Sequence, residues 1–252
     1  MEKTERRLMK IRTVFSLLLP LVFYELCMEA AAGLCRMSGV ENGLLVTGTG
    51  AILALPFLFF AYRKKAGSGS LRRKHLFPAC LFSVFAGAGA CLCFNVVLQV
   101  LLPPSKGWES AQETIYKVPM LARLLVTVLL APLAEELVFR GWFGLELKRY
   151  MKPLPAALLS AVLFGIYHGN LTQGLYAFFL GLCLEWVCFW SESLLPAICL
   201  HVGANAASAV FSAFGAKGQL VLQSKFALFF AAVGALVTVI SLYKTKEVFG
   251  NL

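Results

Sequence analysis

Eight apolar runs recur along the chain, separated by short polar or basic segments, and they constrain the fold more than any other feature. They lie at about 13–35, 43–62, 76–102, 118–147, 154–168, 171–190, 194–213 and 226–243. A helix needs roughly 20 largely apolar residues to cross a hydrocarbon core of about 30 Å. The pattern therefore predicts an all-α fold, a polytopic transmembrane helix bundle of about eight spans.

Composition supports the same conclusion. Of the 252 residues, 59% are apolar and only 14% are charged. A soluble domain of this length cannot bury so much apolar surface, because its ratio of area to volume brings polar side chains outward. We interpret residues 1–252 as one integral membrane domain, with no separate soluble domain.

The basic residues indicate an orientation in the membrane. If the amino terminus is cytoplasmic, the inner segments hold sixteen Lys or Arg residues and the outer segments hold five. Cytoplasmic segments carry an excess of Lys and Arg, so both termini are predicted to be cytoplasmic. Because the net charge of +10 is spread over short blocks between apolar runs, it indicates contact with the lipid bilayer and no nucleic-acid partner.

Ionisable side chains inside the apolar runs indicate function, because each costs a few kcal/mol at membrane depth. We single out residues in five of the runs: Glu25 and Glu29 in the first, Glu135, Glu136 and Arg140 in the fourth, His168 in the fifth, Glu185 in the sixth, and His201 with its polar neighbour Asn205 in the seventh.

Helical spacing divides this polar set into groups. Glu136 and Arg140 are four residues apart, so they share a helical face and are within reach of an ion pair. Glu135 points about 100° away around the same helix, which leaves its carboxylate available for chemistry. His201 and Asn205 also share one face. Taken singly, these residues suit a buried structural pair or a hydrogen-bonded packing histidine, but three helices that bring such groups together predict one catalytic cavity.

The motifs EExxxR at 135–140, FxxxH at 164–168 and HxxxN at 201–205 occur in that order. In this the chain resembles the CPBP intramembrane proteases, also called the Abi or CAAX-protease group. That group includes the Ras-converting type of CAAX endopeptidase and bacterial proteins linked to bacteriocin self-protection. The resemblance covers roughly 120–210, and the protease motif core is predicted at 118–213.

The resemblance implies an intramembrane endopeptidase in which Glu135 is the general base and His168 helps to activate water. His201 and Asn205 would stabilise the oxyanion, and Glu136 with Arg140 would hold the site in shape. The implied partner is a membrane-associated protein or peptide, of the CAAX-type prenylated or the bacteriocin-related class. The implied location is the bacterial cell membrane, with a site that opens to the cytoplasmic side.

The metal requirement has two readings. Glu135, His168 and His201 match the ligand set of a catalytic zinc site with one open position. The chain lacks the HExxH arrangement that places two histidines and a base on one helix. We therefore expect no cofactor, with zinc as the alternative.

Other protease classes fit less well. All 13 acidic residues are glutamate, which excludes an aspartyl dyad, and no apolar run holds the GxSG of a rhomboid-type serine enzyme. Two other classes of function stay open. A membrane transporter would use Glu25 and Glu29, four residues apart in the first run, in a proton relay, and a non-catalytic membrane adaptor would retain only the fold. Glu185 has no assigned role.

Overall fold

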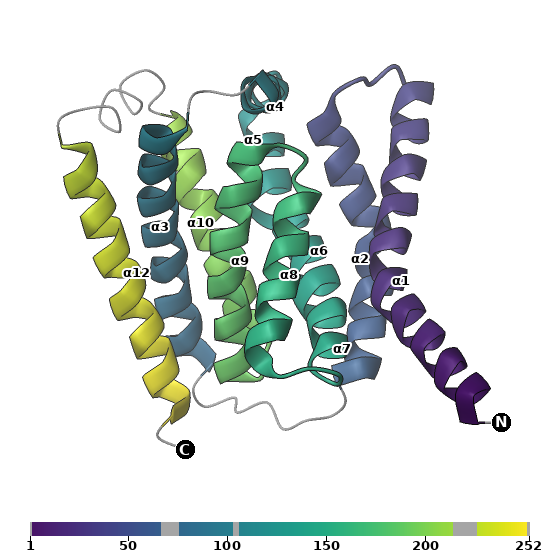
Figure 1. Ribbon diagram of the computed structural model, residues 1–252. Helices are drawn as coiled ribbons and strands as arrows, with labels where there is room; N and C mark the ends of the chain where they lie inside the picture. Colours follow the sequence, from purple (N-terminus) through teal and green to yellow (C-terminus); the bar gives the residue numbers. More distant parts are fainter. Residues whose placement is uncertain (1, 67–75, 103–105, 214–225, 251–252) are drawn as a thin grey trace.

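The computed structural model describes residues 2–66, 76–102, 106–213 and 226–250. These residues form helices and the turns between them, and no strand occurs among them. The long helices stand side by side with their axes roughly parallel (Figure 1). The bundle begins with α1 (Glu2–Met37), α2 (Gly43–Ala66) and α3 (Leu76–Leu101), and it ends with α8 (Pro153–Tyr167), α9 (Leu171–Ser191), α10 (Leu195–Ala213) and α12 (Ala227–Gly250).

Each predicted apolar run corresponds to a helix or, at 118–147, to a continuous stack of helical segments. Six helices are long and apolar enough to cross a membrane: α1 from Thr13 onward, α2, α3, α9, α10 and α12. The all-α membrane fold is confirmed. α8 has only 15 residues, and the stack at 118–147 is divided into short pieces, so the count of eight spans stays a prediction. α1 begins and α12 ends at the same end of the bundle (Figure 1).

The outer surface of the bundle is apolar. Large hydrophobic side chains such as Phe15, Phe60 and Leu228 are each about 70% exposed. In water such a surface would associate, whereas lipid tails solvate it. The interior is instead lined by small residues, and helix backbones meet closely there, as where Gly89 of α3 packs against Gly234 of α12. This is the packing expected where helices associate in lipid.

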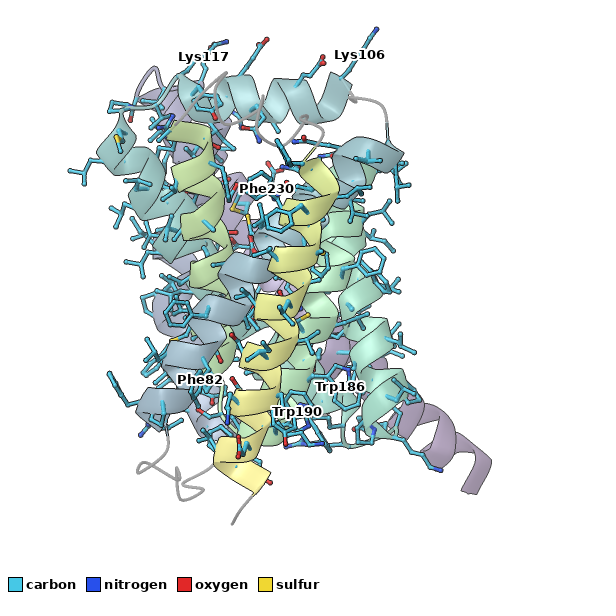
Figure 2. The ribbon with its side chains drawn as sticks, turned by 90° about the vertical axis from the view of Figure 1, so that its left-hand side faces the viewer. Phe82, Lys106, Lys117, Trp186, Trp190 and Phe230 are labelled. Carbon is cyan, nitrogen blue, oxygen red and sulfur yellow. The ribbon has the colours of Figure 1, made fainter. Side chains whose placement is uncertain are left out.

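One helix was not predicted. α4 (Lys106–Tyr116) lies across one end of the bundle, roughly perpendicular to the others (Figure 1), with Lys106 and Lys117 beside its two ends (Figure 2). The Asn42 amide donates to the carbonyl of Thr114 at 2.9 Å and ties the end of α4 to the start of α2. We refer to this end of the bundle as the α4 end.

The stack that carries the first motif alternates α-helical and π-helical turns. It consists of α5 (Met120–Leu124), η2 (Leu125–Leu130), α6 (Ala131–Val138), η3 (Phe139–Gly144) and α7 (Leu145–Leu147). Pro132 lies near the start of α6. Proline offers no N–H and its ring displaces the carbonyl one turn earlier, which explains the wide turn of η2 before it.

Candidate active site

The two adjacent glutamates of α6 have different surroundings. The Glu135 side chain retains 14% of its exposure, whereas that of Glu136 is fully buried. The divergence predicted from helical spacing is therefore present. Part of the Glu135 side chain therefore stays accessible, and Glu136 is available for buried contacts only.

Glu136 belongs to a buried ionic network. Its Oε1 accepts a hydrogen bond from Arg140 Nη1 at 3.0 Å, which confirms the predicted ion pair. Arg140 Nη2 also donates to the carbonyl of Gly181 at 3.3 Å, and Nε lies 3.6 Å from Glu185 Oε1. The hydroxyl of Ser160 donates to the same Glu185 oxygen at 2.7 Å.

These contacts explain Glu185, which had no assigned role. It is the second carboxylate paired with Arg140, and Lys148 lies 3.8 Å from its other oxygen. A glycine at position 144 makes room for it, because a Cβ there would lie 2.9 Å from Glu185 Oε1. A buried cation with two carboxylates and a hydroxyl fixes the relative positions of η3, α8 and α9.

His201 of α10 lies between the two glutamates. Its Nδ1 is 2.8 Å from Glu136 Oε1, and its Nε2 is 3.7 Å from Glu135 Oε2. The buried carboxylate thus orients the imidazole toward the accessible one. Of the two motif histidines, His201 is the one found beside Glu135.

His168 is the C-cap residue of α8. Its Nδ1 donates to the carbonyl of Phe164 at 2.8 Å, so Nε2 is left as a hydrogen-bond acceptor. The Phe164 ring contacts both imidazoles edge to face, with centroids 4.8 Å from His168 and 5.8 Å from His201. The Arg140 guanidinium lies 4.4 Å from the centre of the same ring. Phe164 is therefore the spacer between the two histidines.

Asn205 lies one turn beyond His201. Its Nδ2 donates to the backbone carbonyl of Thr127 at 2.8 Å, within the π-helical turn η2. A carboxamide nitrogen carries two hydrogens, so the second stays available for another acceptor. The structure thus brings all three motifs together at the contact of α6, α8 and α10.

Comparison with known proteins gives one match to a family. A family model described as type II CAAX prenyl endopeptidase Rce1-like matches residues 117–207. We refer to these matched residues as the Rce1-like domain. No curated protein and no solved structure matches the chain. The Rce1-like family is one of membrane endopeptidases, so a protease embedded in the membrane is the activity that the match supports.

A cavity of about 200 Å³ adjoins the motif residues of the Rce1-like domain. His168, Asn205 and Thr127 form part of its wall, and Gln112 and Tyr116 of α4 form part of its far side. Glu135 and His201 do not line it. They lie behind this wall, joined to it through Phe164 and the α10 turn between His201 and Asn205.

Two tyrosines that the sequence analysis passed over border Glu135 of the Rce1-like domain. Tyr24 of α1 and Tyr167 of α8 both lie within electrostatic reach of Glu135 and Glu25, and their ring centroids are 6.1 Å apart. Each tyrosine directly precedes a residue that the sequence analysis had singled out, Glu25 or His168. Glu25 and Glu29 are both exposed, but Glu25 is the one that interacts with Tyr24 and Tyr167 beside the site.

A zinc site would need three ligands grouped around one point. Within the described residues, no group of three His, Cys or Glu side chains is arranged to hold a metal ion. Glu135, His168 and His201 are thus not grouped as ligands. The contacts of the two Nδ1 atoms with Phe164 and Glu136 leave both Nε2 atoms available and do not by themselves oppose zinc binding.

Proposed function

We propose that the Rce1-like domain hydrolyses peptide bonds with Glu135 as general base and His168, His201 and Asn205 as its partners. The observation that carries this proposal is the pairing of His201 with both glutamates. Glu136 is fixed by Arg140 and orients the imidazole, while Glu135 faces it from an accessible position. Two carboxylates with different surroundings are suited to different tasks.

In the proposed reaction, Glu135 accepts a proton from a water molecule whose oxygen attacks the peptide carbonyl carbon. The C–N bond then breaks, and the departing amine takes the proton back from Glu135. His168 supports the attack because its Nε2 can accept a hydrogen bond from the same water.

The oxyanion of the tetrahedral intermediate needs hydrogen-bond donors. Asn205 can supply the amide hydrogen that Thr127 does not use. His201 can donate from Nε2 when both of its ring nitrogens carry protons, since Nδ1 faces Glu136. Preorganised donors of this kind typically contribute about 10²- to 10³-fold to kcat.

We also propose that this reaction proceeds without a metal cofactor. The proposal is supported by the positions of the possible ligands, since no three His, Cys or Glu side chains among the described residues are grouped so that they could hold a metal ion. Cleavage should persist after dialysis against a strong chelator. Loss of cleavage that zinc restores would instead support the alternative site of Glu135, His168 and His201.

Substitution of Glu135 tests the proposed mechanism. Glu135→Gln removes the base and keeps the size of the side chain, so we expect cleavage of a fluorogenic peptide panel, with and without a prenyl group, to fall at least 100-fold. The matched control is Glu29→Gln, the same change at an exposed site on α1, which should leave activity intact. Both variants should unfold at the wild-type temperature in detergent. An active Glu135→Gln protein would refute the assignment.

The side of the membrane from which the substrate enters belongs to the same proposal. The sequence predicts cytoplasmic termini and a site open to the cytoplasm. The cavity, however, lies toward the α4 end, whereas α1 begins and α12 ends at the opposite end (Figure 1). Toward that opposite end lie the buried residues Glu136, Arg140 and Leu194. The two predictions therefore conflict.

We retain the prediction for the termini and propose that the cavity opens on the non-cytoplasmic side. The basic residues support this choice, because Lys65 pairs with Glu146, Lys148 with Glu185, and Lys246 stacks on Trp190, all at the end opposite α4. An opening on the outer side favours a peptide that has been exported, such as a bacteriocin-related precursor, over a cytosolic prenylated protein.

A further inference from the structure

One permanently charged cationic side chain lines the cavity beside His168. Of the described residues that line it, Arg123 of α5 is the only Arg or Lys, and none is glutamate. The other polar lining groups are hydroxyls, amides and the His168 ring. A cavity of this composition is electrostatically selective for an anionic group.

Arg123 lacks a carboxylate partner within the described part of the chain. Its guanidinium lies 4.9 Å from the centre of the Tyr116 ring, and it takes part in none of the ion pairs found between described residues. The glutamates of the neighbouring α4, Glu109 and Glu113, are exposed and do not line the cavity. Stacking on Tyr116 orients the guanidinium and leaves its N–H donors for another group.

Arg123 also has a fixed position relative to the motif residues. Thr127 follows it by one helical turn, and its carbonyl accepts the Asn205 amide. Arg123, Asn205 and His168 all line the same cavity. An arginine at the end of a span commonly meets lipid phosphate at the interface, but one that faces an internal cavity next to a proposed catalytic site is placed to contact the substrate.

We propose that Arg123 binds a carboxylate of the peptide substrate, either the C-terminal carboxylate or an acidic side chain. This inference rests on the proposed function in one respect only, namely that the cavity holds a peptide. Arginine is suited to the task because its planar fork forms two parallel hydrogen bonds with a carboxylate.

The spacing limits where the cut can fall. Glu135 follows Arg123 by twelve residues, which is at most about 18 Å along a helix that rises 1.5 Å per residue. An extended peptide advances roughly 3.3 Å per residue. The cleaved bond should therefore lie no more than about five residues from the bound carboxylate.

The test measures binding, separately from cleavage. Purified full-length Glu135→Gln protein in detergent is titrated with dansyl-labelled hexaalanine as the free acid, as the C-terminal amide, and as the amide with one internal glutamate. We expect at least one carboxylate peptide to bind roughly tenfold or more tightly than the plain amide, since a charge-assisted hydrogen bond contributes at that level. The form that gains affinity identifies the source of the carboxylate.

Arg123→Gln in the same background should bring that affinity ratio to about one, and Arg123→Lys should keep part of it. Lys117→Gln, which removes a nearby cation outside the cavity lining, should keep the full ratio. A ratio that survives Arg123→Gln, equal binding of acid and amide, or no binding of either would overturn the proposal. Failure of Glu135→Gln to abolish cleavage would refute the mechanism and leave this binding result standing.

Discussion

Burial distinguishes Glu135 from Glu136 although they are neighbours in sequence. Glu136 contacts Arg140 and His201 and is fully buried, whereas Glu135 keeps part of its surface accessible. Removing one partner of a buried ionic group leaves an uncompensated charge, which costs much more than losing an exposed pair. The stability of the protein should therefore be sensitive to the loss of Arg140.

Arginine substitutions at buried and exposed positions test this. Arg140→Ala should lower the free energy of unfolding by about 3–5 kcal/mol, because Glu136 and Glu185 would stay buried without their shared cation. Arg149→Ala is the matched control, since Arg149 is 56% exposed and pairs with Glu146 at 3.3 Å, and it should cost less than about 1 kcal/mol. Thermal unfolding in detergent measures both.

Equal losses in the free energy of unfolding for the two substitutions would show that Arg140 matters no more to stability than a residue of a surface ion pair. A loss of activity in Arg140→Ala without a loss of stability would place Arg140 in the chemistry itself.

The sequence predicted the contacts at helical spacing but not those between helices. The Glu136 to Arg140 pair follows from four-residue spacing. The contact of His201 with Glu136 joins residues 65 positions apart, and no periodicity specifies such a pairing. The same holds for Glu185, whose partners lie on three other segments of the chain.

At the scale of elements, α10 starts deeper in the bundle than a count of residues suggests. Glu135 lies twelve residues before Leu147, the end of its stack, whereas His201 is only six residues beyond Leu195, the start of α10. Leu194, just before α10, packs against Gly141, which precedes the end of the stack at Leu147 by six residues. The late start of α10 and the wide π-helical turns of η3 place Glu135 and His201 at the same depth in the bundle. Neither feature is evident from the sequence.

Close contact between α3 and α10 holds the third motif in place. A Cβ at Gly203 would lie 2.3 Å from the carbonyl oxygen of Val84, so the two backbones touch there. His201 and Asn205 are two residues to either side. Gly203→Ala should separate the helices and lower kcat by about 100-fold, because displacements near 1 Å misplace catalytic groups.

Gly33→Ala on α1 is the control, because a Cβ there meets nothing within 4 Å. It should leave activity unchanged and stabilise its helix by up to about 1 kcal/mol. Wild-type kcat in Gly203→Ala, measured on the same peptide panel, would show that α10 is positioned by other contacts.

At the scale of the whole molecule, hydropathy predicted where the helices lie but not which end is open. The α4 helix is amphipathic and too short to span a membrane, so it left no trace in the hydropathy pattern, and it forms part of the cavity wall. The end of the bundle at which the cavity opens depends on where α5, α8, α9 and α10 begin and end relative to one another. That arrangement is a property of packing and not of any single run.

Accessibility to a membrane-impermeant thiol reagent determines which end faces the cytoplasm. Gln112→Cys places a thiol on α4 at the cavity, and Lys152→Cys places one in the turn between α7 and α8 at the opposite end. With the unsubstituted protein as the background for its eight native cysteines, Gln112→Cys should react in intact cells and Lys152→Cys only after permeabilisation. The reverse pattern would mean that the basic end faces outward, against the positive-inside rule, and that the cavity admits cytosolic substrates. Because this measurement needs no enzymatic activity, it selects between exported and cytosolic peptides even before a substrate is known.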